Sequence, residues 1–389
     1  MRDTQQDTPP SSVNGDDIGA MDDEMYYEEV EEIQLEDLES MLEEQEEEDI
    51  EMEPPEDHSS IVFKKHVGST FCCDIHPKGL LAVTGAEDDK GYVWSIETGD
   101  VVSDCSGHKD SVIFAGFSFD GAYVATGDMA GLIKVWEVNT ANQNQWNVAF
   151  EYETEDLIWG FWHFGARVLI FGVESGDIYV FKIPSGEMKV LKGHNFKVEC
   201  GKLFPDGRRL AAGYADGAVK IWELKTSSLV SQVPANVEEL KLCILLSTGK
   251  VLLTTPNNGK VVAQLQAGSD LETLAFSQEP SGYLAIGSLT GAVSIWDTAR
   301  QMLRHQCVKP EDESGVTKML WIKNHLVTGC LDGSVRVYES RNGERKRVFT
   351  GHESAILDLC YNAEKKLILT TSDDDTARVF LYDVNNDND

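Results

Sequence analysis

A unit that recurs about every 42 residues constrains the fold of this chain more than any other feature. A typical copy has an apolar strand ending in a small residue and glycine, then a polar turn, then an alternating strand closed by an aromatic residue. The clearest copies are VATGDMAGLIKVW (124–136), LAAGYADGAVKIW (210–222), LAIGSLTGAVSIW (284–296) and LVTGCLDGSVRVY (326–338). Short strands joined by tight turns form antiparallel sheets, and this period is the length of one four-stranded blade. We therefore predict an all-β propeller.

The number of blades follows from the number of copies. The closing positions of the aligned copies are Trp94, Trp136, Phe181, Trp222, Gln264, Trp296, Tyr338 and Phe380. We predict eight blades over residues 59–389, with seven as the alternative. The alternative stays open because Gln264 replaces the aromatic residue and lies only 32 residues before Trp296.

The two ends of the repeat region predict how the ring closes. Only nine residues follow Phe380, whereas SSIVFKKH (59–66) precedes the first copy and belongs to no other blade. We expect this segment to pair with the last blade, because the pairing would remove an exposed strand edge and join the ends of the ring.

The recurring unit resembles the WD repeat, in which a histidine, a turn aspartate and the closing aromatic residue hold each blade together. The resemblance assigns such structural roles to His194, Asp216, Trp222, His352, Asp374, Trp94, Trp136 and Trp296. In the second copy Ala130 takes the place of the aspartate. We therefore expect His108 to lack the partner that the turn aspartate supplies in other copies.

Acidic residues concentrate at the N-terminus. Residues 1–58 contain 24 Asp and Glu and one basic residue, Arg2, in a chain with a formal net charge of −34. Such a segment buries too little apolar surface to offset its chain entropy, so we predict a disordered tail over 1–58. Apolar residues at partly helical spacing from Met25 to Leu42 leave two interpretations open. The tail either folds against a basic partner or only improves solubility.

Composition and motifs argue against several functional classes. The acidic balance argues against direct nucleic-acid binding, which needs a basic footprint. The sequence has no apolar run long enough to span a membrane. We expect no secretory signal, because the first residues lack an apolar core. Phosphate-loop, zinc-protease and serine-hydrolase motifs are absent, so we expect no enzymatic activity, no cofactor and no metal.

The same features predict where the protein resides. The eight cysteines form no C-x-x-C pair, and most lie in apolar strand-like segments. Reduced, buried thiols are typical of a cytosolic protein. We expect a monomer in the cytoplasm, with the nucleus and the cell periphery as further locations.

We expect protein binding at one rim of the propeller. In WD repeats, this rim is lined by the residue before the turn aspartate and by the residue after the first apolar position of the inner strand. The acidic members of these two sets are Glu87, Glu174, Glu199, Glu272 and Asp373. Lys241 is the one basic member. The remaining members, most of them apolar, are Phe71, Ile113, Met129, Ile158, Ala215, Asn257, Leu289, Thr317, Leu331 and Leu357. Such a rim suits a Lys/Arg-rich peptide with an apolar anchor, and the alternative is an ordinary solvated surface.

Several strings resemble one WD-repeat family closely. LAVTGAEDDKGYVW, GHKDSV, VATGDMAGLIKVW and LRHQC, together with the acidic N-terminus, resemble the angio-associated migratory cell protein family. The resemblance implies a non-enzymatic protein linked to cell migration and angiogenesis. The family is related to a yeast WD-repeat chaperone of a large-subunit ribosomal protein. Two hypotheses follow: a chaperone for a basic ribosomal protein, or a signalling adaptor at the cell cortex.

Overall fold

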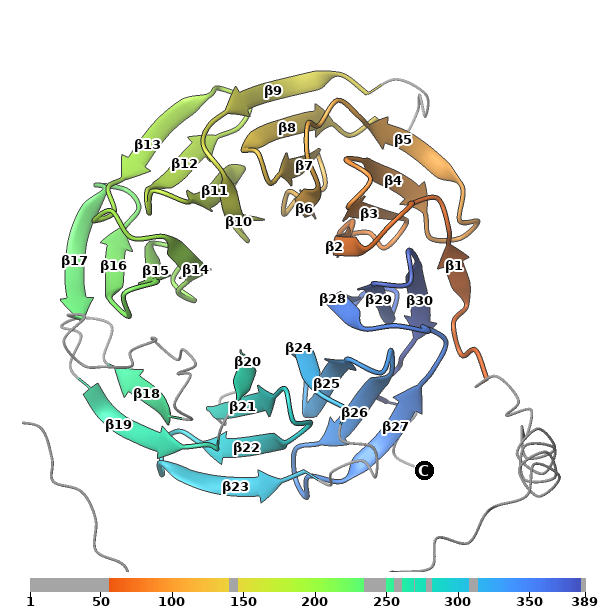
Figure 1. Ribbon diagram of the computed structural model, residues 1–389, viewed down its shortest axis with the longest axis vertical. Coiled ribbons are helices and arrows are strands. Elements are labelled where there is room, and N and C mark those ends of the chain that lie inside the picture. The colour runs from red at the N-terminus through yellow and green to blue at the C-terminus, as the bar shows by residue number, and fades with distance from the viewer. Residues whose placement is uncertain are drawn as a thin grey trace, which may run out of the picture. The chain divides into compact units, whose positions relative to one another are not determined.

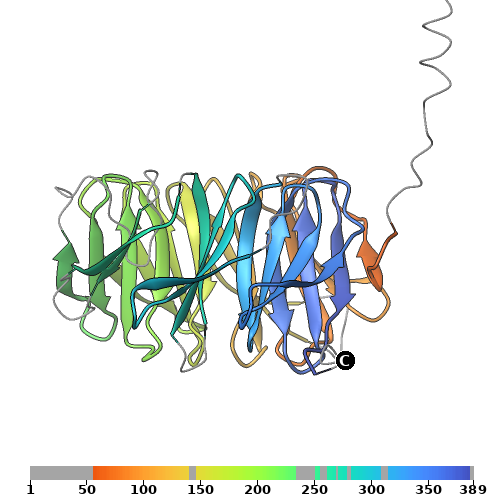
Figure 2. The ribbon, with the colours of Figure 1, turned by 90° about the horizontal axis from the view of Figure 1, so that it is seen from below.

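The computed structural model describes residues 56–139, 146–233, 250–254, 261–268, 270–277, 282–307 and 314–385. All of them belong to one compact unit, Pro55–Asp389. Every regular element in this part of the chain is a β-strand, and the strands surround a central axis as blades of a propeller (Figure 1). Seen edge-on, the turns between strands gather at two opposite faces (Figure 2). The predicted disordered tail, apart from its last three residues, lies outside the described residues.

Six blades are formed by four consecutive antiparallel strands, with the first strand of each nearest the axis. They are β2–β5 (Thr70–Ile75, Leu81–Ala86, Gly91–Ser95, Val101–Cys105), β6–β9 (Val112–Phe117, Tyr123–Asp128, Leu132–Glu137, Val148–Glu153), β10–β13 (Leu157–Trp162, Val168–Val173, Ile178–Lys182, Glu187–Leu191), β14–β17 (Val198–Leu203, Arg209–Tyr214, Val219–Glu223, Ser228–Val233), β20–β23 (Leu271–Phe276, Tyr283–Ser288, Val293–Asp297, Met302–Gln306) and β24–β27 (Val316–Ile322, His325–Cys330, Val335–Glu339, Arg345–Phe349). The seventh blade combines β28 (Ile356–Asn362), β29 (Leu367–Ser372) and β30 (Ala377–Leu381) with β1 (Ile61–Phe63).

The prediction of eight blades is wrong, because the described residues form seven four-stranded blades. The fifth repeat contributes only the two-stranded sheet of β18 (Lys250–Thr254) and β19 (Val261–Gln266). Val251 and Leu265 of this sheet pack against the β20–β23 blade. The sequence of the fifth repeat explains why it forms no complete blade, because it lacks the histidine, the turn aspartate and the aromatic residue of the others. Its closing position, Gln264, also lies only 32 residues before that of the next copy, Trp296.

The ring closes through pairing of strands from its two ends. β1 pairs antiparallel with β30, and Ile61 lies opposite Val379 in the register. Contacts begin before this strand, because the backbone N–H of His58 donates to the carbonyl of Thr350 at 2.9 Å. Asp57 forms an ion pair with the buried guanidinium of Arg378. The domain boundary at residue 59 stays a prediction.

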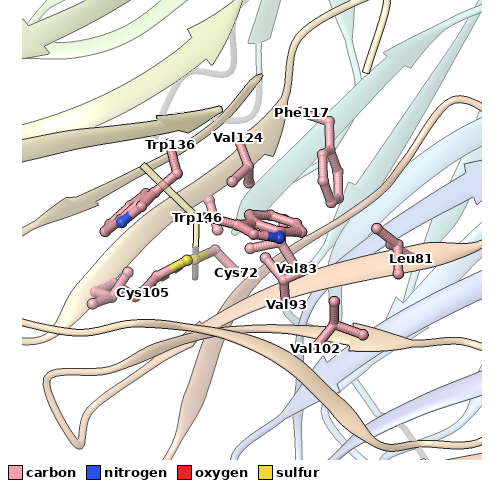
Figure 3. Packing of buried hydrophobic residues seen from close by; sticks show 12 residues of the cluster. Cys72, Leu81, Val83, Val93, Val102, Cys105, Phe117, Val124, Trp136 and Trp146 are labelled. Carbon is pink, nitrogen blue, oxygen red and sulfur yellow. Dashed lines mark hydrogen bonds between the residues drawn. The ribbon is translucent and has the colours of Figure 1, made fainter. Parts of the chain in front are cut away.

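The core lies between neighbouring blades. The β2–β5 and β6–β9 blades enclose a buried cluster that includes Val83, Val93, Val124 and Trp136 (Figure 3). Trp146, which precedes β9, covers the same cluster and donates from Nε1 to the carbonyl of Asn139 at 3.1 Å. Burial of each large apolar side chain stabilises the fold by about 1.5–3 kcal/mol, so these blade interfaces dominate stability.

Close packing between blades also requires glycine at particular strand positions. Trp159 of β10 donates from its indole nitrogen to the carbonyl of Val198 at 3.1 Å, which fixes the ring against β14. A Cβ atom at Gly201 of β14 would lie 2.3 Å from the Cη2 atom of this ring. Only glycine allows the indole to lie this close to the backbone.

Most cysteine side chains in the described part of the chain are buried. Seven cysteines there are free thiols, and Cys243 lies outside the described part. Cys200 and Cys360 are half-buried and the others are buried. Burial raises the pKa of the Cys307 thiol to about 12, which keeps it protonated at neutral pH. The described part of the chain has no helix long and apolar enough to span a bilayer.

Candidate protein-binding rim

Each inner strand carries a β-bulge near its start. In β2 the register shifts between Thr70 and Cys72, so Phe71 is an extra residue without a partner in the ladder. The same shift occurs at the start of all seven inner strands that the structure describes. The extra residues are Phe71, Ile113, Ile158, Glu199, Glu272, Thr317 and Leu357. A bulge redirects the side chain of its extra residue, and these are the described positions of one predicted rim set.

A second repeated contact fixes the turn between the second and third strands. The backbone N–H of Glu87 donates to the carbonyl of Ser69, in the loop that precedes the inner strand, at 3.0 Å. The same bond recurs in every complete blade. Its donors are Glu87, Met129, Glu174, Ala215, Leu289, Leu331 and Asp373, and all seven side chains are exposed. These residues form the other predicted set. Asn257 and Lys241, predicted for the fifth copy, lie outside the described residues.

The two sets lie on the same face of the ring. In the first blade Thr70 pairs with Ala86, so the bulge at Phe71 and the turn at Glu87 directly follow one pair of the ladder. Because the hydrogen bond and the bulge recur in each complete blade, the arrangement repeats around the ring. We refer to these turn and bulge residues together as the rim.

Two of the five acidic rim residues meet where the ring closes. The backbone N–H of Ser69 donates to Oε2 of Glu87 at 3.3 Å, and its hydroxyl donates to Oδ1 of Asp373. Glu87 belongs to the first blade and Asp373 to the last. The single serine therefore holds two carboxylates close together at the surface.

The other three acidic rim residues are spread over three blades. Lys197 Nζ lies 3.9 Å from Oε2 of Glu174, which partly neutralises this carboxylate. Glu199 occupies the bulge of the next blade, and Glu272 occupies the bulge of β20; both are exposed. The structure thus brings Glu87 and Asp373 into one cluster, places Glu174 and Glu199 on neighbouring blades, and leaves Glu272 apart from them.

Apolar side chains interrupt the acidic rim. Leu289 and Leu331 are exposed by 46% and 43%, on neighbouring blades. Both lie against Gly315, where a Cβ atom would come within 2.4 Å of the Leu289 carbonyl oxygen and 2.7 Å of Leu331 Cδ1. The backbone of Leu289 and the side chain of Leu331 thus meet at this glycine, and each exposed leucine offers apolar surface to a partner.

Histidines hydrogen-bond to aspartates in the turns that carry rim residues. In the last blade, His352 Nδ1 lies 2.8 Å from Oδ2 of Asp374, and Nε2 lies 2.8 Å from the Thr370 hydroxyl. Burial on its own would raise the pKa of Asp374. Hydrogen bonds from His352, Thr376 and the Glu353 backbone instead hold this pKa well below its usual value. Asp374 therefore stays ionised and fixes the turn that presents Asp373.

His194 and Asp216 form the corresponding contact in the β14–β17 blade, with Nε2 and Oδ2 2.9 Å apart. Ala212 occupies the position that holds threonine in the last blade, and the described residues supply no hydrogen-bond partner to the buried His194 Nδ1 atom. The predicted structural tryptophans all lie in the core. They are Trp94, Trp136, Trp222 and Trp296.

His108 has no turn aspartate at position 130, as expected, but another carboxylate takes that place. Its Nδ1 atom lies 3.1 Å from Oδ2 of Asp128, at the end of β7, and its Nε2 atom lies 2.7 Å from the Thr126 hydroxyl. Asp128 also accepts a hydrogen bond from the backbone of Leu132 at 2.8 Å. The acidic partner of His108 therefore lies two residues before Ala130, which is the position of the turn aspartate in other copies.

Sequence reasoning also missed His66, because Lys65 precedes it in place of glycine. His66 Nδ1 lies 3.1 Å from Asp88, and Nε2 lies 2.9 Å from Thr84. A constant interval between histidine and aspartate in the sequence could have predicted this contact. The histidine precedes its aspartate by 22 residues here and in the His194 and His352 blades, and precedes its threonine by 18 wherever threonine is present.

Among the described residues, no group of three or more His, Cys, Asp or Glu side chains is placed to hold a metal ion. His66, His108 and His352 instead hydrogen-bond to aspartate and threonine. The rim is thus an arrangement of exposed carboxylates and apolar side chains on a rigid framework, which is suited to binding.

Comparison with known proteins agrees with this architecture. Residues 99–137, 186–223 and 343–380 match the WD domain, G-beta repeat family. The chain is 38% identical to the human angio-associated migratory cell protein over 360 residues, which cover 85% of this chain and 81% of the relative.

More distant relatives include ribosome assembly factors. The chain is 24% identical to the Saccharomyces cerevisiae ribosome assembly protein SQT1, covering 83% of this chain and 86% of the relative. A crystal structure of Chaetomium thermophilum Sqt1 bound to the N-terminus of ribosomal protein L10 superposes with a TM-score of 0.75 and 23% identity. The match covers 84% of this chain and all of that one. At this level of identity the superposition shows a shared fold.

Proposed function

The chain belongs to the angio-associated migratory cell protein family of WD-repeat proteins, and on this premise we propose that it is a binding platform for a basic segment of a ribosomal protein. The rim is the proposed binding surface. It acts without catalysis, by shielding the positive charges of its partner before ribosomal RNA does so. This role places the protein in the cytoplasm, as a monomer that associates with its protein partner.

One observation carries the proposal: bulges and turn hydrogen bonds repeat in all seven complete blades and present five carboxylates on one face. Loops that a rigid framework holds in place lose little entropy on binding. Carboxylates on such loops attract lysine and arginine over a distance and speed association. The pair formed by Glu87 and Asp373 suits a cationic side chain, and Leu289 with Leu331 suits an apolar one.

The relatives support the choice of partner. The Chaetomium thermophilum protein of the same fold is bound to the N-terminus of ribosomal protein L10. We extend this partner to the present chain because its rim carries acidic charge. Roles in cell migration and angiogenesis stay predictions.

Co-purification of full-length ribosomal protein L10 with the full chain tests this function. We expect the two to co-purify, and to separate as salt concentration rises, because exposed ion pairs are screened. The double substitution Glu199→Lys and Glu272→Lys should reduce recovery of L10 about tenfold, equivalent to about 1.4 kcal/mol. Reversal of two exposed charges on the opposite face, Glu97→Lys and Glu364→Lys, is the matched control and should leave recovery unchanged.

Two results would contradict the proposal. If L10 is not recovered at low salt, the ribosomal partner is wrong. If it is recovered equally with both double variants, the binding surface is not the rim. Thermal unfolding of each variant confirms that the ring is intact, because all four positions are exposed.

A further inference from the structure

A pocket of about 560 Å³ lies on the face opposite the rim, between the β10–β13 and β14–β17 blades. Val168, Val180 and Leu224 form apolar parts of its wall. The remaining wall is dominated by charged side chains from the ends of β12, β13 and β16 and from the β14–β15 turn. Its volume lies in the range of sites that take a small ligand or one or two side chains of a peptide.

The pocket is basic although the whole chain is strongly acidic. Its lining contains four lysine or arginine residues, Lys182, Lys189, Arg208 and Lys225, and two glutamates, Glu187 and Glu223. Lys182 lies 3.9 Å from Glu187, and Lys189 donates to the carbonyl of Lys225 at 2.6 Å. Arg208 and Lys225 are exposed, and neither forms an ion pair with a carboxylate in the part of the chain that the structure describes.

Hydrogen bonds between blades hold the loops around the pocket in place. The backbone N–H of Gly165 donates to Nδ1 of His163 at 3.0 Å, so the ring carries its proton on Nε2 and donates to the carbonyl of Gly207 at 2.7 Å. His76 makes the equivalent pair of contacts, from Lys78 at 3.2 Å and to Gly121 at 3.2 Å. With the same tautomer, His76 therefore links the first blade to the second, and His163 links the third blade to the fourth.

Two further bonds extend this connection along the same face. Arg167 donates from Nε to Asp120 at 2.7 Å, and Asn362 of the last blade donates to the carbonyl of Pro77 at 3.1 Å. The turns of five successive blades, from the last through the first to the β14–β17 blade, are thereby tied together. Turns fixed in this way are prepared for binding, because little ordering is left to complete.

Exposed apolar side chains lie on these tied turns. Leu80, Phe119 and Phe164 occupy the equivalent turn in three successive blades and are exposed by 51%, 44% and 57%. Phe164 stacks on His163, which lines the pocket, with ring centroids 4.9 Å apart. An apolar arc therefore leads along the face to the basic pocket.

We propose that this face docks an acidic peptide segment of a partner protein, with carboxylates in the pocket and apolar side chains along the arc of Leu80, Phe119 and Phe164. Arg208 and Lys225 receive the carboxylates, because both are exposed and neither forms an ion pair with an acidic group among the described residues. The apolar walls and Phe164 receive the adjoining apolar side chain. The opposite sign of the two faces allows one ring to hold a basic and an acidic partner together.

A binding titration with a labelled peptide of alternating glutamate and phenylalanine tests the docking face on the full chain. We expect the double substitution Arg208→Glu and Lys225→Glu to weaken binding about tenfold or more, and Phe164→Ala to weaken it by a similar factor. Arg345→Glu with Lys346→Glu, on the exposed strand β27, is the matched control and should bind as the unmodified chain does. A peptide with glutamine in place of glutamate should bind at least about tenfold more weakly.

Equal binding by the pocket variant and the β27 control would overturn the proposal, as would equal binding of the glutamine peptide. The outcome is independent of the rim. The variant Glu199→Lys with Glu272→Lys should bind the acidic peptide at least as well as the unmodified chain. Loss of L10 binding in that variant, without loss of acidic-peptide binding, separates the two faces.

Discussion

Ser60 donates two hydrogen bonds, from its backbone nitrogen at 2.8 Å and its hydroxyl at 2.9 Å, to the carbonyl oxygen of Val379, 319 residues later in the chain. The contact begins the pairing of β1 with β30 that completes the last blade. The ends of the ring are therefore held by a strand from the N-terminal side, and the rigidity of the rim depends on this closure.

The closing strand contributes a buried aromatic side chain. Phe63 is almost fully buried and stacks on Trp94 of the first blade, with ring centroids 4.7 Å apart. We predict that Phe63→Ala lowers the free energy of unfolding by about 3–5 kcal/mol, because it removes this contact and leaves a cavity. Chemical denaturation measures the change. Leu381→Ala, on the exposed side of the same sheet, should change it by less than about 0.5 kcal/mol. Equal effects would show that β1 does not hold the ring.

The ionised Asp374 gives stability a defined dependence on pH. Its pKa is lower in the folded protein than the usual value of 3.8, despite burial, because His352 and other donors favour the carboxylate. The stabilisation is therefore present above about pH 4 and is lost as pH falls toward the lower folded-state pKa. Asp374→Asn should cost about 2 kcal/mol at neutral pH and flatten the acid limb of the unfolding curve. Asp375→Asn, which is exposed, should do neither.

Close contact between blades limits what position 201 can hold. An added methyl group at Gly201 meets the indole of Trp159, which its hydrogen bond to Val198 prevents from moving freely. We predict that Gly201→Ala destabilises the fold by about 1–3 kcal/mol. Gly165→Ala is the control, because the nearest atom to a Cβ there is 3.8 Å away. Similar melting temperatures for the two variants would contradict this packing.

Much of the architecture could be predicted because strand periodicity and turn chemistry are local. The repeat alignment selected Phe71 and Glu199 without knowledge of bulges, and the structure shows that both are extra residues of a bulge. The count of blades could not be predicted in the same way. Gln264 belongs to an apolar alternating segment like its counterparts, yet β18 and β19 form only a two-stranded sheet.

Contacts between residues that are separated in the chain could not be predicted from the sequence. Asp128 contacts His108 because a carboxylate at the end of a strand can reach the histidine as well as one in the turn can. The basic pocket depends on Lys189 reaching the carbonyl of Lys225, 36 residues away on another blade. No local pattern marks such a meeting, whereas the 22-residue interval from His66 to Asp88 is a signal that sequence alone contains.

Titration of the full chain with the N-terminal peptide of ribosomal protein L10 tests the central claim most directly, namely that the acidic rim binds a basic segment. We predict saturable binding that weakens as ionic strength rises, and that Glu199→Lys with Glu272→Lys weakens it about tenfold while Glu97→Lys with Glu364→Lys does not. Absence of binding at low salt, or equal affinity of the two double variants, would contradict the account.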